Sequence, residues 1–522
     1  MAAVDKLVGP PEPAAYHVAY GGRAARSQRH LLLPVLHSIQ DRVGWVSRGA
    51  LEYACRRLAV PPADAFGVVS FYGRFALEPG GSERVHVCDD LVCMLAGARS
   101  DHGSPCLGQC DRAPATLIER FGDGYEELQT PPHERPHTSG SRLLRRVGVV
   151  DPDSLDSYVG HGGFEALRRA GEIGGEHVIR LVTESNLLGR GGAAFPTGRK
   201  WDSVAKAPAP RYLVCNADES EPGTFKDRVL MEGDPFAIVE AMAIAAMAAA
   251  CEKGYIYIRT EYPLARRRIA NAIAQSREAG LIDFDIEVRR GAGAYICGEE
   301  TALFNSIEGK RGEPRNKPPF PVQSGLFGRP TLVNNVETLV NVLDIVRGDF
   351  TDTRLFCVSG RVSEPGVYEV PLGTPLRALL VQAGTRDVHT VLLGGAAGSF
   401  LTPEQLDVPL SFDGTRAIGA TLGSGAVIVF DDAADMKPVL LRIARFFRDE
   451  SCGQCVPCRV GTKRQEEILE RMLHARNGDR QADAMLLSDI AQAMRDASIC
   501  GLGQTAANAI ASGLTQLKVL DG

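Results

Sequence analysis

The stretch RYLVCNADESEPGTF, residues 211–225, places a short apolar segment directly before a run of polar and acidic residues. Its apolar half predicts a buried strand, and its polar half predicts a loop at the end of that strand. The segments GYIYIR (254–259) and FDIEVRRGAGAYICGEE (284–300) repeat the strand-like pattern, with helical patterns between them and glycines near the strand ends. This alternation predicts a layered, Rossmann-like α/β core over residues 141–350.

Two further units are expected before this core. Residues 29–78 carry apolar side chains at helical spacing, so residues 1–80 are predicted to form a small helical bundle. The pattern RVHVC, residues 84–88, predicts a short strand at the start of a second unit, residues 81–140. A polar, proline-rich linker over residues 127–142 is expected to end that unit.

Two units are expected after the core. Residues 354–373, RLFCVSGRVSEPGVYEVPLG, predict a β-hairpin, and residues 374–384 predict the helix that follows it. A small β-grasp domain over residues 351–430 fits this order. Residues 431–522 are predicted to be helical and enclose a group of cysteines. The fold class is therefore multidomain α/β.

The composition excludes several classes of partner. The chain has 522 residues and a net charge of −6, without the basic excess that nucleic acid or anionic lipid favours. No signal peptide is apparent at the start. The most apolar segment, residues 237–251, is interrupted by Glu240 and is too short to span a membrane, so it predicts a buried helix. We expect a cytoplasmic protein with no direct membrane span.

Four cysteines in the helical tail form the first candidate metal site. Cys452, Cys455 and Cys458 are spaced by three residues, and Cys500 follows 42 residues after Cys458. Four cysteines also form closed zinc sites, but structural zinc sites usually pair two C-x-x-C motifs. Three closely spaced thiolates with one remote thiolate are typical of a 4Fe-4S cluster. The spacing therefore favours the cluster over zinc or free thiols.

The segment LLGRGGAAFPTGRKW, residues 187–201, is a candidate cofactor loop. Gly189, Gly191 and Gly192 lack side chains where a backbone must approach a ligand closely. Arg190 and Lys200 can neutralise a phosphate. Taken alone, such a segment is more often an ordinary turn.

Further polar loops follow in the same α/β unit, and they strengthen this interpretation. The alternative is that these segments are only polar loops that cover a sheet and bind no ligand. Five such loops in one domain favour a binding site. The residues singled out in them are Asn216, Asp218, Glu219, Gly298, Glu299, Glu300, Lys317, Phe320, Asn334 and Asn335.

These motifs, in this order and spacing, resemble the flavin and NADH-binding subunit of respiratory NADH:quinone oxidoreductase and its soluble relatives. The resemblance covers residues 151–522. The preceding residues resemble the partner 2Fe-2S subunit of the same module, with a helical start and cysteines at Cys88, Cys93, Cys106 and Cys110. A fusion of the two is most similar to the β subunit of NAD-dependent, molybdenum- or tungsten-containing formate dehydrogenases.

The resemblance implies which residues bind the cofactors. For FMN it implies Gly189, Arg190, Gly192, Lys200, Asn216, Asp218, Glu219, Tyr295, Gly298, Glu299, Asn334 and Asn335. For the nicotinamide nucleotide it implies Phe195, Glu221, Glu300, Lys317 and Phe320. The two phenylalanines offer flat faces for stacking, and acidic side chains near the dinucleotide would repel a 2′-phosphate and favour NAD over NADP.

The N-terminal cysteine group departs from the family pattern. Only 12 residues separate Cys93 from Cys106, where the family has a helix and a strand, so a truncated thioredoxin-like domain is expected. All four cysteines are nevertheless present, which favours a 2Fe-2S cluster. Zinc or an empty site is the alternative, and a partner chain could replace the missing elements.

The resemblance also implies a function and partners. NAD exchanges two electrons at once and an iron–sulfur cluster takes one, so a flavin is needed between them, and no catalytic side chain is expected. We expect a diaphorase subunit that works with a molybdenum or tungsten formate dehydrogenase α subunit containing Fe–S clusters, with a small 2Fe-2S subunit as a further candidate partner. The alternatives are the equivalent subunit of an NAD-reducing hydrogenase or of respiratory NADH:quinone oxidoreductase, and a redox-inactive assembly scaffold.

Overall fold

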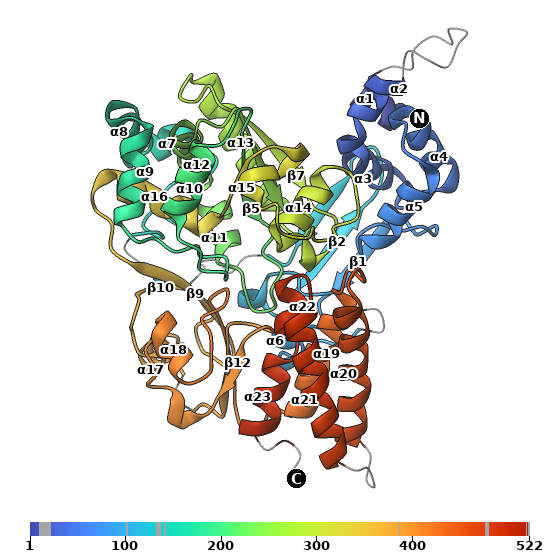
Figure 1. The fold of residues 1–522 in the computed structure, drawn as a ribbon, viewed down its shortest axis with the longest axis vertical. Coiled ribbons are helices and arrows are strands. Elements are labelled where there is room, and N and C mark those ends of the chain that lie inside the picture. Colours follow the sequence, from blue (N-terminus) through green and yellow to red (C-terminus); the bar gives the residue numbers. More distant parts are fainter. Residues whose placement is uncertain are drawn as a thin grey trace.

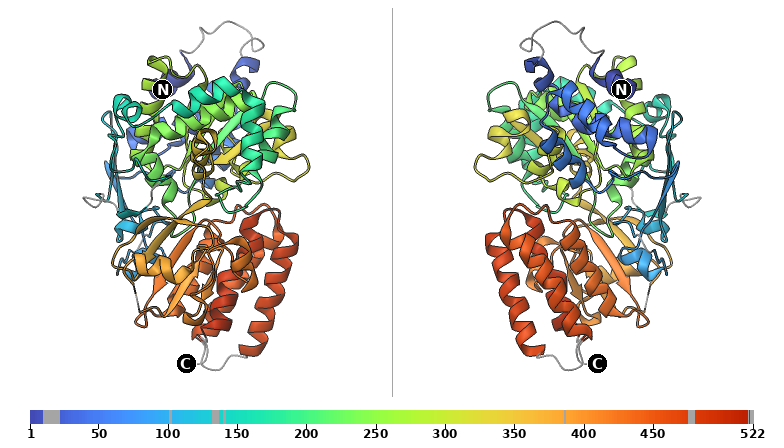
Figure 2. Two further views of the ribbon diagram at one scale, coloured as in Figure 1. Left: turned by 90° about the vertical axis from the view of Figure 1, so that its left-hand side faces the viewer. Right: turned by 90° about the vertical axis from the view of Figure 1, so that its right-hand side faces the viewer.

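The computed structural model describes residues 1–9, 22–100, 103–131, 137–139, 142–385, 387–474, 480–517 and 519. Figure 1 shows the central α/β domain above, flanked by the N-terminal helices, with a β-rich domain and a helical bundle side by side below it. Figure 2 shows the same two-tier arrangement from both sides. Within the described residues, no helix has the length and apolar character needed to cross a membrane.

The central domain contains a four-stranded parallel sheet in the order β7-β6-β5-β8. Its strands are β5 (Tyr212–Ala217), β6 (Lys253–Ile258), β7 (Asp285–Arg290) and β8 (Thr331–Asn335). Neighbouring strands β5 and β8 pair Asn216 with Asn335. The polar residues that end these two strands therefore lie side by side, at the edge where open parallel sheets bind ligands.

Only the first part of segment 284–300 is a strand. After β7, Gly293 adopts a positive φ of 79°, which glycine tolerates and other residues rarely adopt. The chain then forms a 3-10 turn, η3 (Tyr295–Gly298), and helix α14 (Glu300–Ile307). The glycines thus turn the chain back across the end of the sheet.

The apolar segment predicted as a buried helix is α12 (Pro235–Ala249). It carries Glu240, which is fully buried. The Glu240 carboxylate accepts hydrogen bonds from the Tyr158 hydroxyl and from the backbone amides of Phe164 and Leu167. A buried acid is tolerated here because its oxygens are satisfied.

Further helices surround the sheet. They are α7 (Leu155–Gly160), α8 (Glu165–Ile173), α9 (Gly175–Glu184), α10 (Thr197–Ala205), α11 (Lys226–Gly233), α13 (Pro263–Glu278), α15 (Pro321–Ser324), η4 (Leu326–Gly328) and α16 (Val336–Arg347).

The N-terminal region begins with helices, as the sequence predicts. They are α1 (Ala2–Val8), α2 (Gly22–Ser27), η1 (Arg29–Leu31), α3 (Leu32–Val43), α4 (Arg48–Leu58) and α5 (Pro62–Phe71). Ser47 caps α4, because its hydroxyl accepts the Ala50 amide at 3.3 Å. Pro62 opens α5, where its missing N–H costs nothing.

A three-stranded antiparallel sheet follows in the order β1-β2-β3. Its elements are β1 (Glu83–Val87), α6 (Leu91–Leu95), η2 (Cys110–Arg112), β2 (Thr116–Arg120) and β3 (Glu126–Gln129). The expected linker over residues 127–142 is only partly a linker. It contains most of β3 and also β4 (His137–Ser139), because the backbone groups of both segments pair with neighbouring strands.

The β-rich domain forms a mixed six-stranded sheet in the order β12-β11-β13-β9-β10-β4. Its elements are β9 (Thr353–Gly360), β10 (Gly366–Pro371), α17 (Leu376–Gln382), β11 (Thr390–Leu393), β12 (Ser399–Leu401), η5 (Pro403–Gln405), α18 (Phe412–Ala417) and β13 (Ala426–Phe430). Strands β9 and β10 pair antiparallel as the predicted hairpin. This domain has its own apolar core.

The C-terminal domain is helical, in agreement with the sequence pattern. Its helices are α19 (Met436–Asp449), α20 (Val456–His474), α21 (Arg480–Ala497), α22 (Gly501–Thr505) and α23 (Asn508–Gln516). Helix α23 packs against β12 of the β-rich domain. The two lower domains therefore touch directly (Figure 1).

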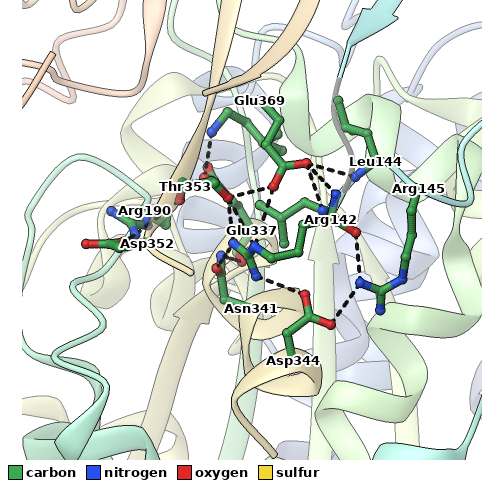
Figure 3. A network of polar contacts seen from close by, with 12 residues as sticks. Arg142, Leu144, Arg145, Arg190, Glu337, Asn341, Asp344, Asp352, Thr353 and Glu369 are labelled. Atoms are coloured by element: carbon green, nitrogen blue, oxygen red, sulfur yellow. Dashed lines mark hydrogen bonds and ion pairs between the residues drawn. The ribbon is translucent and has the colours of Figure 1, made fainter. Parts of the chain in front are cut away.

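Arg142 connects the central domain with the β-rich domain (Figure 3). Its guanidinium donates to Asp344 at 2.9 Å and Asn341 at 2.7 Å on α16, and to the Thr353 hydroxyl at 2.7 Å on β9. Glu369 on β10 accepts the Leu143 amide at 2.8 Å. The Arg142 side chain is only 8% exposed and that of Asp344 only 2%, so this ion pair is shielded from water.

We expect the Arg142→Leu variant to lose about 3 kcal/mol or more of stability, because it leaves the buried Glu369 without its cation and removes one of the cations of Asp344. Urea unfolding followed by fluorescence and circular dichroism measures the loss. Arg377→Leu is the control, since Arg377 pairs with Asp407 at the surface and its loss should change little. Equal unfolding midpoints for the wild type and Arg142→Leu would contradict the assignment.

Candidate functional site

The carboxyl ends of β5 and β8 gather the polar residues predicted for the flavin. Asn216 donates from its side-chain amide to the Gly298 carbonyl at 2.8 Å, and its Oδ1 accepts the Asp218 amide at 3.2 Å. The loop after β5 is thereby tied to the η3 turn. The structure brings Asn216, Asp218, Gly298 and Asn335 together at one edge of the sheet.

Asp218 has an oxygen that no described protein group satisfies. Its Oδ2 is buried and has no hydrogen-bond partner among the described residues. A Cβ on Gly298 would lie 3.4 Å from the Asp218 carbonyl and 3.8 Å from Oδ2. Burial raises the pKa of Asp218 well above its usual range. An unsatisfied buried oxygen beside a glycine fits a polar ligand such as the flavin.

The glycine-rich loop approaches the same edge from the other side. A Cβ on Gly191 would lie 3.3 Å from the Asn335 Cβ, so the backbone passes close to the end of β8. Gly192 has a φ of 110°, and a Cβ there would lie 3.7 Å from the Gly423 backbone of the β-rich domain. The loop is fixed by hydrogen bonds from the Gly189 amide to the Phe195 carbonyl and from the Arg190 amide to the Thr338 hydroxyl, both 2.9 Å.

Two predicted flavin residues also contact neighbouring elements through their side chains. The Arg190 guanidinium is buried and pairs with Asp352 of the β-rich domain (Figure 3). The Glu219 carboxylate accepts the backbone amides of Asp227 at 2.9 Å and Arg228 at 3.0 Å, at the start of α11. Burial raises the pKa of Glu219 to about 8. Their side chains fasten neighbouring elements.

The asparagines at the end of β8 also have defined partners. Asn334 accepts the indole N–H of Trp201 at 2.9 Å. Asn335 accepts the Glu337 amide at 3.0 Å and caps α16, while its own amide donates to Asp227 at 2.6 Å. The N-terminus of α16 therefore points into the site, an orientation that suits an anionic group.

Residues predicted for the nucleotide make charge contacts with residues predicted for the flavin. Lys200 Nζ lies 5.8 Å from the Phe195 ring centre and 3.6 Å from Glu300. Lys317 pairs with Glu299 at 2.8 Å and with Glu300 at 3.1 Å.

Phe195 and Phe320 are half exposed, at 49% and 52%. Their open faces are available to a planar ligand.

Glu221 contacts both the η3 turn and the β-rich domain, which the sequence does not reveal. Its carboxylate accepts the Tyr295 hydroxyl at 2.6 Å and the Ala397 amide at 2.8 Å. The Tyr295 amide in turn donates to Glu450 at 2.8 Å, two residues before Cys452. Sequence reasoning missed Ala397 because it acts through its backbone, and missed Glu450 because its only signal is its place beside the cysteine run.

The four C-terminal cysteines line one small cavity. Cys452, Cys455, Cys458 and Cys500 share this cavity with Ile296 of the η3 turn and with apolar neighbours. Burial raises the pKa of Cys458 to about 11 and that of Cys500 to about 12. Thiols that converge on a small apolar cavity fit an iron–sulfur cluster, which binds them as thiolates.

The N-terminal cysteines are also gathered. The Cys106 and Cys110 sulfurs are 3.6 Å apart, and all four thiols are buried. Hydrogen bonds from Cys110, and to a lesser degree from Cys88, hold the pKa of Cys106 well below its usual range. Backbone amides donate to the Cys93 and Cys106 sulfurs at 3.4 Å, as is common for cluster ligands.

This cysteine group is fastened to the central domain. Arg228 donates to the Gly108 carbonyl at 3.0 Å, and Arg259 donates to the Cys106 carbonyl at 2.6 Å. Within the described part of the chain, no three His, Cys, Asp or Glu side chains form a site for a single metal ion.

The geometry defines a class of protein, which has a flavin site beside two cysteine sites. Four family descriptions match the chain in order. They are thioredoxin-like 2Fe-2S ferredoxin (20–101), Nuo51 FMN-binding domain (182–344), SLBB domain (355–384) and NADH-ubiquinone oxidoreductase-F iron-sulfur binding region (438–518). The multidomain fold class and the FMN, 4Fe-4S and 2Fe-2S assignments are thereby confirmed.

Similarity to individual proteins supports the same family. The chain is 44% identical to the F 2 subunit of NADH-quinone oxidoreductase from Rhizobium meliloti (strain 1021), over 72% of this chain and 95% of the relative. It is 42% identical to the HndC subunit of the NADP-reducing hydrogenase from Solidesulfovibrio fructosivorans, over 70% of this chain and 80% of that protein.

A solved structure covers more of the chain. It is the crystal structure of NAD+-reducing NiFe-hydrogenase in the H2-reduced state, with a TM-score of 0.82 and 31% identity, covering 94% of this chain and 92% of that chain. The chain belongs to the family of NADH-quinone oxidoreductase F subunits, and it carries an additional N-terminal 2Fe-2S domain. It is an NAD-dependent flavin and iron–sulfur oxidoreductase subunit.

We expect Cys106→Ser to remove a 2Fe-2S EPR signal while FMN content and NADH oxidation by ferricyanide stay close to wild type. The reason is that the substitution replaces only a sulfur, which contacts Cys110 and the Gly108 amide, and keeps the Cys106 carbonyl that Arg259 binds. Cys251→Ser, a change at a cysteine outside both groups, is the control and should leave the spectrum unchanged. An unchanged spectrum in Cys106→Ser, or one equivalent of zinc in the wild type, would contradict the assignment.

Proposed function

We propose that this chain transfers electrons between NAD(H) and iron–sulfur clusters through FMN, as the NAD-linked subunit of a larger complex. The observation that carries the proposal is the η3 turn. Gly298 of this turn accepts a hydrogen bond from Asn216 at the flavin edge, and Ile296 lines the cysteine cavity. Two residues of one short turn thus adjoin both candidate cofactor sites, so an electron would have a short path between them.

We assign FMN to the edge formed by the glycine-rich loop and the ends of β5 and β8. Bound there, FMN supplies the conversion between two-electron and one-electron transfer, which amino-acid side chains lack. Asp218 would satisfy a polar group of the ligand, and the start of α16 would face its phosphate. Phe195, Phe320 and Lys317 would orient the nucleotide.

We assign no catalytic side chain. Hydride and electron transfer between bound carriers require position and tuned potential, and they need neither a nucleophile nor an acid and base pair. The residues of this chain would therefore bind, orient and exclude water. The non-enzymatic alternative is an assembly scaffold, and cofactor content separates the two.

We infer that the partner is a substrate-oxidising subunit of an NAD-linked complex of the hydrogenase kind. Supporting this, the NAD+-reducing hydrogenase chain covers 94% of this chain, N-terminal domain included. The NADH-quinone oxidoreductase relative covers 72% of this chain. A formate-oxidising partner rests only on the resemblance seen in the sequence, and none of the relatives named above is a formate dehydrogenase.

Purification of the native complex tests this proposal. We expect the complex to reduce NAD with hydrogen, and the chain itself to oxidise NADH with ferricyanide. Reduction of NAD with formate and not with hydrogen would replace the partner and leave the electron-transfer role intact. A purified chain without flavin absorbance and without NADH oxidation would contradict the proposal as a whole.

We expect Glu221 to make NADH oxidation depend on pH. Burial raises its pKa to about 7, so the carboxyl is neutral below that pH and charged above it. The wild-type kcat/KM for NADH should change between about pH 6 and pH 8, and Glu221→Gln should remove that change because glutamine stays neutral. Steady-state kinetics at several pH values measure it, and an unaltered profile in Glu221→Gln would contradict the role.

A further inference from the structure

A tight turn of the β-rich domain holds the Glu221 carboxylate from one side. Within Gly394–Gly398, between β11 and β12, the Ala397 amide donates to Glu221 Oε1 at 2.8 Å. The turn closes on itself, because the Gly398 amide donates to the Gly395 carbonyl at 2.9 Å. The other carboxylate oxygen accepts the Tyr295 hydroxyl at 2.6 Å.

The turn has no space for a larger residue at Gly395. Its φ is 76°, and an added Cβ would lie 2.5 Å from the Glu221 Cγ, far inside van der Waals contact. The backbone of the turn therefore lies directly against the glutamate side chain. Any shift of the turn would move the carboxylate.

Both groups that hold Glu221 are themselves bonded to the helical domain that carries the C-terminal cysteines. The Ala397 carbonyl accepts the side-chain amide of Asn508, the first residue of α23, at 3.3 Å. The Tyr295 amide donates to Glu450, at the end of α19, at 2.8 Å. Glu221 is thus linked to the cysteine domain along two separate routes.

We propose that Asn508 is a positioning residue for the nucleotide site, and that it acts on Glu221 through the backbone of Ala397. The hydrogen bond to the Ala397 carbonyl fixes the plane of that peptide, and the amide on the neighbouring side of Ala397 aims at the carboxylate. The inference rests on the proposed function and on the role at the nucleotide that the family resemblance implies for Glu221. It adds that the helical domain orients the nucleotide site as well as holding its cluster.

The test uses the full chain with its cofactors. Asn508→Ala should raise the KM for NADH about threefold to tenfold, the effect of one misplaced hydrogen bond, with little change in kcat. FMN and iron content should match the wild type. In a Glu221→Ala background, Asn508→Ala should raise the KM no further, because the group that it positions is gone. Thr515→Ala is the control, since the Thr515 hydroxyl donates to carbonyls of its own helix.

Gly395→Ala tests the contact between the Gly394–Gly398 turn and Glu221 without altering the helical domain. It therefore remains informative even if Asn508→Ala loses cofactor. Gly395→Ala should also raise the KM for NADH. In a Glu221→Ala background it should cause no such rise, because the side chain that the added Cβ would clash with is gone. An unchanged KM in an Asn508→Ala variant that keeps its cofactors, an unchanged KM in Gly395→Ala, or the same rise with and without Glu221, would overturn the inference. A wild-type chain that does not oxidise NADH would instead overturn the proposed function.

Discussion

The close approach of the η3 turn to the end of the parallel sheet is the constraint on which the site depends. Tyr295–Gly298 reaches the end of β5, where the Gly298 carbonyl accepts a hydrogen bond from Asn216. Gly298 lies against Asp218, since a Cβ there would be 3.8 Å from the buried Oδ2, in van der Waals contact. On its other side the same turn closes the cysteine cavity through Ile296. One short turn therefore fixes how far apart the two cofactor sites can lie.

Buried charges keep the domains in the positions that this turn requires. Arg142 joins the central and β-rich domains, and Arg228 and Arg259 join the N-terminal cysteine loop to the central domain. Such pairs gain little net stability, because desolvation costs about as much as the attraction returns. They are demanding in geometry, however, and a guanidinium with several fixed partners permits only one arrangement of the domains.

The sequence predicted the elements whose patterns are local. The hairpin of β9 and β10, the buried helix α12 and the helical tail follow from periodicity and from turn residues, and the cysteine cavity follows from spacing. It did not predict β4, because a three-residue strand is defined by a partner more than two hundred residues away. The sequence also did not predict the partners of the Arg190 and Glu219 side chains. Arg190 forms an ion pair and Glu219 accepts a backbone amide at the start of α11, and both contacts form only in the tertiary structure.

An anaerobic titration of the purified chain with NADH, followed by visible absorption and EPR, tests the central claim most directly. We expect about one FMN per chain, bleaching of the flavin band, and a 4Fe-4S signal that grows as NADH is added. Replacing Cys455 by serine should remove that signal and leave the flavin bleaching. Flavin that bleaches while the wild-type cluster stays oxidised, or a chain that binds neither cofactor, would contradict the proposed electron path.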